Sequence, residues 1–259
     1  MKVLILDTQA EAVARTVALV ADQLRDRPAS VLGLATGGTM VPVYAGLRAL
    51  AAAGEISFAQ ATTFNLDEYL GLSPDDPRSY RGTMQAELFD HIDIDPARTH
   101  LPLGDAPDPE AEADRYDAAI AAAGGIDLQL LGLGHNGHIG FNEPTSSLTS
   151  RTRIKTLTQE TRAANARYFP AGDMPRFALT MGVGTIMDAR HCLLLATGAG
   201  KAEAVAAMVE GPVSAACPAS ILQMHRRATV VLDRPAAARL RLLEYYFHVH
   251  PNGEARDLS

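Results

Sequence analysis

Hydrophobic positions along the chain fall into short apolar runs, and longer Ala-rich stretches with helical periodicity separate these runs. The short runs lack strict polar alternation, which is typical of strands buried on both faces of a parallel sheet. The predicted strands are Val3–Leu6, Val31–Ala35, Ala61–Asn65, Leu128–Leu133, Cys192–Ala196 and Thr229–Leu232. The predicted helices span about Thr8–Arg25, Pro42–Ala53, Ser79–Asp90, Pro109–Ala123, Lys201–Val209 and Pro235–Tyr246.

This order of elements predicts an α/β fold: a doubly wound, mostly parallel sheet with helices on both faces. Thr8 followed by Glu11 is the signature of a capping box at the first helix. No Ser/Gly-rich linker, repeat or low-complexity segment divides the chain, so we expect a single domain over residues 1–259. Ligands of such sheets bind outside the carboxyl ends of the strands, which makes the loops after strands the candidate sites.

Composition narrows the class of protein. With 23 basic and 30 acidic residues the net charge is −7, which argues against a nucleic-acid partner but allows a local anion site. The apolar runs are too short and too often interrupted by charge to cross a membrane, and the N-terminal run is too short for a signal peptide. Two cysteines, Cys192 and Cys217, are too few for a disulfide framework. We therefore expect a cytoplasmic protein without a membrane partner.

The first candidate loop is Thr36-Gly37-Gly38-Thr39, which follows the second predicted strand and precedes a helix with Pro42 near its start. Glycines let the backbone approach a ligand, and a helix N-terminus offers N–H groups to an anion. The segment indicates either a phosphate cradle or only a tight strand-to-helix turn. It matches neither G-x-G-x-x-G nor the P-loop motif, so a dinucleotide site is not predicted.

The second candidate is a pair of adjacent carboxylates, Asp67 and Glu68, within Phe64–Tyr69 after the third strand. Carboxylates are costly to bury, and one of the two could serve as a general base. Taken alone, however, the segment favours a solvated loop with a helix N-cap.

The third candidate, Leu131–Pro144, holds four glycines, two histidines, two asparagines and Glu143 in one loop. A histidine near a carboxylate can be held in one tautomer and used as an acid or base. A zinc site of His135, His138 and Glu143 is an alternative, but the spacing is not H-E-x-x-H and no cysteine supports it. A purely structural loop is a further alternative. We expect no metal and no other cofactor.

The fourth candidate is a group of five cationic residues, Arg151, Arg153, Lys155, Arg162 and Arg167. In an acidic chain this density indicates an anion site, although a solvated charged face is the commoner explanation. Lys201, one of only three lysines, follows Thr197–Gly200 at another strand-to-helix junction, where a point charge suits phosphate. The four loops together favour proton transfer on a small phosphorylated metabolite. Without G-x-S-x-G, a nucleophilic hydrolase is disfavoured.

Several motifs in this order resemble the glucosamine/galactosamine-6-phosphate isomerase family: Leu34–Thr39, Phe64–Tyr69, Gly137–Pro144 and Ser150–Thr156. The similarity extends from about Val31 to Tyr246. It implies a Rossmann-like fold and the conversion of glucosamine 6-phosphate to fructose 6-phosphate and ammonia. The alternatives are a galactosamine-6-phosphate deaminase, a 6-phosphogluconolactonase on the same fold, or a sugar-phosphate sensor without catalysis.

The resemblance also implies roles for individual residues. Asp67 is expected to move the proton between C2 and C1 of the sugar. His138 is expected to open the pyranose ring, with Glu143 as its carboxylate partner. Asn136 stands where some members have Asp, and it can orient His138 without carrying a charge. The substrate phosphate is expected at Thr36, Gly37, Gly38, Thr39, Arg167 and Lys201.

Some members of the family are activated by N-acetylglucosamine 6-phosphate at a subunit interface. The residues that correspond to their effector site are Ser146, Arg153, Lys155, Thr156 and Tyr246. The resemblance therefore implies an allosteric homo-oligomer, with a hexamer as the expected assembly.

Overall fold

The computed structural model describes residues 1–169 and 172–254. Its central sheet has seven strands in the order β1 (Lys2–Leu6), β10 (Ala228–Asp233), β9 (Cys192–Ala196), β6 (Leu128–Leu131), β2 (Val31–Leu34), β3 (Thr62–Asn65) and β5 (Thr99–His100). All pairings in this sheet are parallel. The predicted α/β fold is confirmed, and each of the six predicted strands is present. The two-residue edge strand β5 was not predicted.

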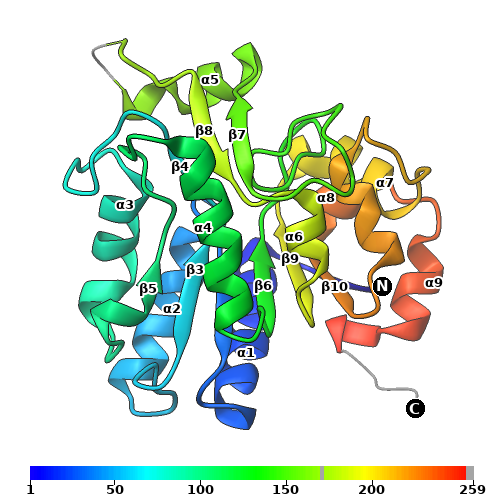
Figure 1. The fold of residues 1–259 in the computed structure, drawn as a ribbon. Coiled ribbons are helices and arrows are strands. Elements are labelled where there is room, and N and C mark those ends of the chain that lie inside the picture. Colours follow the sequence, from blue (N-terminus) through cyan, green and yellow to red (C-terminus); the bar gives the residue numbers. More distant parts are fainter. Residues whose placement is uncertain (170–171, 255–259) are drawn as a thin grey trace.

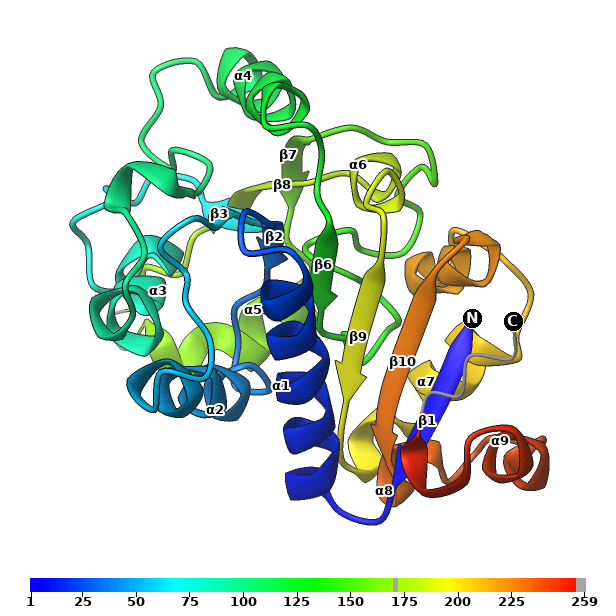
Figure 2. The same cartoon turned by 90° about the horizontal axis from the view of Figure 1, so that it is seen from below.

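Helices cover both faces of this sheet (Figures 1 and 2). On one face lie α1 (Gln9–Asp26) and α2 (Val41–Ala52), and on the other α4 (Pro109–Ala122) and α6 (Val183–Met187). The remaining helices are α3 (Tyr80–Glu87), α5 (Gln159–Asn165), α7 (Ala202–Val209), α8 (Arg234–Ala237) and α9 (Leu243–Val249). Short 3₁₀ turns occupy Phe89–His91, Pro96–Arg98, Ala166–Tyr168, Ala199–Lys201, Pro218–Met224 and Pro251–Gly253.

Helix ends follow local hydrogen bonds. The predicted capping box is confirmed: the Thr8 hydroxyl accepts from the Glu11 N–H, and the Glu11 carboxylate accepts from the Thr8 N–H. The predicted helix Pro235–Tyr246 is wrong, because the chain breaks into α8 and α9. The Glu210 carboxylate accepts the backbone N–H groups of Arg241 and Leu242 just before α9, which starts a new helix there.

The strand order reverses direction between β2 and β6. From β2 the chain continues outward to β3 and β5, whereas from β6 it continues the other way to β9, β10 and the β1 edge. A side chain on Gly33 of β2 would place its Cβ 2.0 Å from Oε1 of Gln129 on β6, so only glycine lets these strands pair with Gln129 lying across β2. Crevices outside the carboxyl ends of strands at such a switch point are where ligands bind.

A second, antiparallel sheet consists of β4 (Asp67–Tyr69), β8 (Phe177–Thr180) and β7 (Arg153–Thr156). With α5 it forms the upper part of the molecule in Figure 1. It encloses its own apolar cluster: Tyr69, Leu72, Phe141, Leu157, Phe169, Met174 and Ala178. The expectation of a solvated loop at Asp67 and Glu68 is wrong, because pairing within this sheet leaves them only 5% and 2% exposed.

Within the described ranges no helix is long and apolar enough to cross a membrane. Cys192 and Cys217 are both buried free thiols. The main core is formed by the central strands and the helices packed on them, with Leu4, Leu130 and Val231 completely buried. The central sheet is therefore a rigid base beneath the smaller sheet.

A buried histidine at the amino-terminal end of the central sheet contributes to the pH dependence of stability. His191 is 5% exposed, and its Nε2 lies 2.9 Å from the Thr229 hydroxyl. Burial, aided by the positive charge of Arg227, lowers the pKa of His191 from 6.5 to about 4. The neutral ring thus contributes stability that is complete above pH 6.5 and is lost as the pH falls through about 4. This linkage amounts to roughly 3 kcal/mol.

We predict that His191→Gln removes this contribution, so that the unfolding free energy of the variant rises relative to that of the unsubstituted protein as the pH falls from 6.5 to 4, measured by urea unfolding across that range. His248→Gln, the same substitution at an exposed histidine, is the matched control. If the unfolding free energy of His191→Gln changes with pH as that of the unsubstituted protein does, the assignment to His191 is contradicted.

Candidate active site

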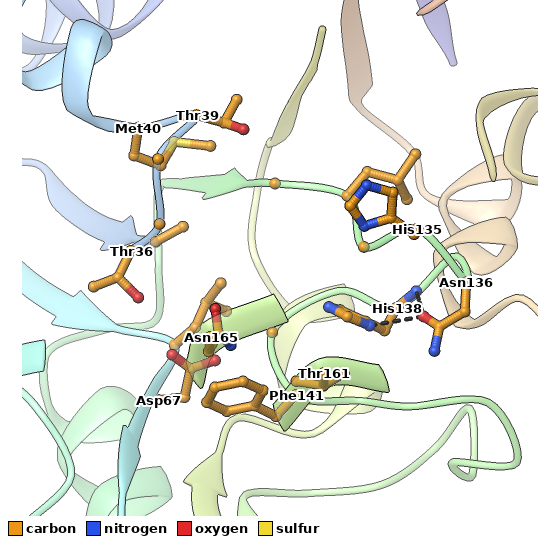
Figure 3. A pocket seen from close by; sticks show the side chains of 18 of the residues that line it. Thr36, Thr39, Met40, Asp67, His135, Asn136, His138, Phe141, Thr161 and Asn165 are labelled. Atoms are coloured by element: carbon orange, nitrogen blue, oxygen red, sulfur yellow. Dashed lines mark hydrogen bonds between the residues drawn. The ribbon is translucent and has the colours of Figure 1, made fainter. Parts of the chain in front are cut away.

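A cavity of about 490 Å³ opens at the carboxyl ends of the central strands, at the switch point. Its wall includes most of the residues that the sequence singled out: Thr36, Gly37, Gly38, Thr39, Asp67, Asn136, His138, Arg167 and Lys201. Figure 3 shows Thr36 and Thr39 on one side and His135 with His138 on the other, while Asp67 lies beside Phe141. Segments that are far apart in the sequence therefore contribute to one site.

The adjacent carboxylates of β4 are separated by the alternation of the strand. Asp67 lines the cavity. Glu68 points away and accepts the backbone N–H groups of Tyr80 and Arg81, both at 2.9 Å, in the first turn of α3. This helix start partly compensates the Glu68 charge. Of the two candidates for a general base, only Asp67 faces the site.

The Asp67 carboxyl is the most strongly perturbed acid of the cavity wall. Burial raises its pKa, the charge of Glu68 adds to the rise, and a hydrogen bond with Thr180 opposes both, so that the pKa reaches about 8. A carboxyl that titrates near neutral pH is suited to take up and return a proton.

His138 is held in one tautomer by its neighbours. Its Nδ1 lies 2.7 Å from the side-chain oxygen of Asn136, which can only accept, so Nδ1 carries the proton (Figure 3). The Asn136 amide nitrogen donates in turn to Glu143 Oε2 at 2.8 Å. Nε2 of His138 is therefore the nitrogen available to exchange a proton.

Glu143 lies behind this pair and is not part of the cavity wall. One of its oxygens accepts from the hydroxyls of Thr158 and Thr161, and the other accepts from Asn136 and lies 3.4 Å from His138 Nδ1. Burial alone would raise the pKa of this carboxyl, but these neighbours lower it to about 2. Glu143 is thus an ionised group that orients the Asn136–His138 pair from behind.

Arg167, Lys201 and the Gly37–Gly38 turn all line the cavity. A Cβ on Gly38 would lie 3.8 Å from Arg167 Nη2, so Arg167 lies over the Gly37–Gly38 turn. Gly37 has a φ of +106°, which an L side chain rarely adopts. Lys201 Nζ lies 3.5 Å from His135 Nδ1, and its charge is the main cause of the lowered pKa of His135. This arrangement is suited to a phosphate.

The alternative zinc set is not assembled. In residues 1–169 and 172–254 no three His, Cys, Asp or Glu side chains converge as metal ligands. His135 is next to a lysine, and the oxygens of Glu143 are occupied by hydroxyl and amide donors.

Several residues of the cavity wall were not found by sequence reasoning, chiefly Tyr80, Phe141, Glu160, Thr161 and Asn165. They enter from α3, from α5 and from the loop before β7, and the sequence alone does not place these elements over the strand ends. Phe141 lay inside the Gly-rich loop but was not singled out. The Tyr80 hydroxyl lies 3.1 Å from the Tyr69 hydroxyl.

The residues expected to form a regulatory site lie outside the cavity. Arg153 and Lys155 are on β7, and Arg153 Nη1 donates to Asn142 Oδ1 at 2.8 Å. Among the described residues, Arg153 Nη2 and the Ser146 hydroxyl are buried without a hydrogen-bond partner. Tyr246 is on α9, far from β7 in both views, and its hydroxyl binds Glu210 (Figures 1 and 2). A single chain does not bring Tyr246 to the other four.

The family described as glucosamine-6-phosphate isomerases/6-phosphogluconolactonase matches residues 7–231. The chain belongs to this family. Proteins named glucosamine-6-phosphate deaminase are similar over nearly the whole length. The one from Hahella chejuensis is 58% identical, covering 95% of this chain and 94% of its own, and the one from Shewanella loihica is 54% identical, covering 98% and 95%. The chain is an enzyme of this family, and the resemblance read from its motifs is confirmed.

Solved structures agree. One described as a monomeric glucosamine-6-phosphate deaminase has a TM-score of 0.90 and 48% identity to this chain, covering 92% of this chain and all of that one. The 6-phosphogluconolactonase from Trypanosoma brucei has a TM-score of 0.71 at 20% identity, covering 92% and 98%. The latter likeness shows the shared fold alone.

The position of the His138 ring depends on the absence of a side chain at Gly134. A Cβ there would lie 2.3 Å from three atoms of the imidazole, so the ring rests directly on the glycine backbone. We predict that Gly134→Ala displaces the ring and breaks its bond to Asn136, seen as a change in the side-chain ¹H–¹⁵N resonances of His138.

The matched control is Gly132→Ala, whose Cβ would meet only the flexible end of Met40, at 3.6 Å. It should leave the His138 resonances unchanged. Unchanged His138 resonances in Gly134→Ala would contradict the packing of the ring on the Gly134 backbone.

Proposed function

We propose that this enzyme converts glucosamine 6-phosphate and water to fructose 6-phosphate and ammonia. One observation carries the proposal: a buried carboxyl that titrates near neutrality, a histidine of fixed tautomer and a cation-lined loop share a single cavity. The names of the similar proteins support this choice of substrate.

Phosphate binding comes first in the proposed mechanism. The Thr36–Thr39 loop, Arg167 and Lys201 hold the phosphate and thereby fix C1 and C2 of the sugar against the acid–base groups. His138, through Nε2, moves a proton between O1 and O5 and opens the ring. Binding energy from the remote phosphate is in this way used to orient the reacting atoms.

Asp67 then takes the proton from C2, which gives an enolamine, and returns it to C1, which gives an imine at C2. Water adds to this imine, and ammonia leaves. The free carboxyl, with a pKa of about 8, is largely protonated at neutral pH. The ammonium group that glucosamine 6-phosphate carries at C2 lowers this pKa on binding, so the substrate itself promotes formation of the base.

The deciding experiment measures ammonia and fructose 6-phosphate from glucosamine 6-phosphate. Equal amounts of both products support the proposal. Release of ammonia from galactosamine 6-phosphate alone would move the assignment to the other epimer. Acid release from 6-phosphogluconolactone alone would make the enzyme a lactonase, and tight binding without turnover would make it a sensor.

Two substitutions are expected to separate chemistry from binding. Asp67→Asn keeps the shape of the site but cannot accept a proton, so kcat falls by about 10²–10⁴ with little change in KM. Lys201→Ala removes a phosphate contact and mainly raises KM. Steady-state kinetics of both variants check this. Near-normal turnover by Asp67→Asn would remove Asp67 from the mechanism.

We further propose that N-acetylglucosamine 6-phosphate activates the enzyme at Ser146, Arg153, Lys155 and Thr156. The support is a buried serine hydroxyl and a buried guanidinium nitrogen that have no protein partner, which suits a phosphate ligand. Tyr246 joins this site only from a second copy of the chain, in a homo-oligomer for which we propose a hexamer. The solved glucosamine-6-phosphate deaminase of similar structure is described as monomeric. Measuring the assembly state of this enzyme is therefore the more decisive part of the test.

We predict that Lys155→Ala abolishes the response to N-acetylglucosamine 6-phosphate and leaves basal turnover within about twofold, because β7 lies outside the cavity. Initial-rate curves with and without effector measure this, and light scattering gives the assembly. Arg151→Ala is the control, since its guanidinium binds Asp117 and Asp188. A monomer whose rate ignores the effector would overturn the regulatory proposal and leave the catalytic one intact.

A further inference from the structure

Thr180 ends β8 inside the small sheet and is completely buried. It is in register with Asp67 of β4 on one side and with Arg153 of β7 on the other. Opposed residues of neighbouring strands point to the same face of a sheet. Thr180 and Asp67 are therefore neighbours by the pairing of the strands.

The Gly140–Phe141 turn covers both side chains. The Phe141 N–H donates to Thr180 Oγ1 at 3.1 Å. Gly140 has a φ of +56°, and a Cβ on it would lie 2.9 Å from Thr180 Oγ1 and 3.4 Å from Asp67 Oδ2. The turn, the hydroxyl and the carboxyl thus meet at one point, where no side chain fits at position 140.

The hydroxyl has a single proton to donate. Its oxygen already accepts from Phe141, so the proton points to another acceptor. The Met181 carbonyl is 3.4 Å away, which is long for a bond from a hydroxyl. Asp67, paired with Thr180 across the strands, is the other acceptor in the described part of the chain, and an ionised carboxylate is a stronger acceptor than a carbonyl.

We propose that Thr180 is a positioning residue that donates its hydroxyl proton to ionised Asp67 and fixes this carboxylate beneath the Gly140–Phe141 turn. The inference rests on the proposed function in that Asp67 is taken as the base. It adds the group that makes the ionised base attainable in a buried site.

Within residues 1–169 and 172–254, Thr180 is the side chain that lowers the Asp67 pKa by a hydrogen bond, while the hydroxyls of Tyr80 and Tyr116 donate to Tyr69 and to the Asn65 carbonyl. Glu68 on the same strand raises the pKa of Asp67, as burial does, whereas Thr180 lowers it. Burial raises the pKa values of the Tyr69, Tyr80 and Tyr116 phenols, and the Asp67 charge adds to the rise. The cationic or titratable groups that share the cavity are His135, His138, Glu160, Arg167 and Lys201.

The kinetic test compares Thr180→Val, which keeps the shape but has no donor, with Thr180→Ser, which keeps the donor. If the proposal holds, the acidic limb of kcat/KM moves up by about one to two pH units in Thr180→Val, as expected for losing one hydrogen bond to a charged group. It stays within about half a unit in Thr180→Ser. At pH values above the shifted limb, Thr180→Val regains most of its rate.

A substrate-free test uses thermal unfolding from pH 5 to 10. Because the pKa of Asp67 is raised in the folded state, the native protein loses stability relative to Asp67→Asn as the pH rises towards about 8, and the difference then levels off. In Thr180→Val this stability difference should level off at a pH about one to two units higher. In the Asp67→Asn background, Thr180→Val should have the same effect at every pH.

The two tests also separate this inference from the proposed function. Without turnover of glucosamine 6-phosphate the function fails, yet the unfolding curves still decide the role of Thr180. If the midpoint of Thr180→Val does not move, or if its effect is equally pH-independent with Asp67 present, Thr180 only packs the sheet and the proposal is overturned. If Thr180→Val does not fold, Thr180→Ala replaces it in both tests.

Discussion

The burial of the Asp67 carboxyl is the constraint on which the surrounding structure depends. An acid kept from water resists ionisation, yet a base must ionise in order to act. The small sheet suits the proposed role of Asp67 in both respects, because it leaves the carboxyl only 5% exposed and sets the Thr180 hydroxyl opposite it. The turn above is narrow enough to close over both only because position 140 is glycine. Local backbone geometry and the acid strength of one side chain are thus consequences of the same packing.

A second carboxylate next to such a group would normally make the site unstable. Here the alternation of β4 sends Glu68 to the opposite side, where the first N–H groups of α3 bind it. That bond also fixes the start of α3 and so brings Tyr80 to the cavity wall. The adjacent acids therefore have different surroundings: Glu68 binds the start of a helix, and Asp67 faces the cavity.

Sequence reasoning found the central strands and the loops after them, because buried parallel strands leave continuous apolar runs and their carboxyl ends converge. It did not find the small sheet: β7 is the charged run Arg153–Thr156, and its pairing with β8 joins segments more than twenty residues apart. Without the family resemblance, the residue pattern did not separate Asp67 from Glu68, since their environments differ only once β4 pairs with β8. Glu143 was found by its neighbours, but its place behind the cavity wall depends on hydroxyls of the α5 region.

The small sheet also joins the two proposed ligand sites physically. Arg153 and Asp67 flank Thr180 in register, and Arg153 binds Asn142, whose amide donates to the carbonyls of Ile139 and Met181. An anion held by Arg153 would therefore act on the segments that cover the Asp67 carboxyl. Because coupling between sites is reciprocal, any state that favours ionised Asp67 would in turn bind that anion differently. The proposed regulation and the acid strength of Asp67 would then depend on the same packing of the small sheet.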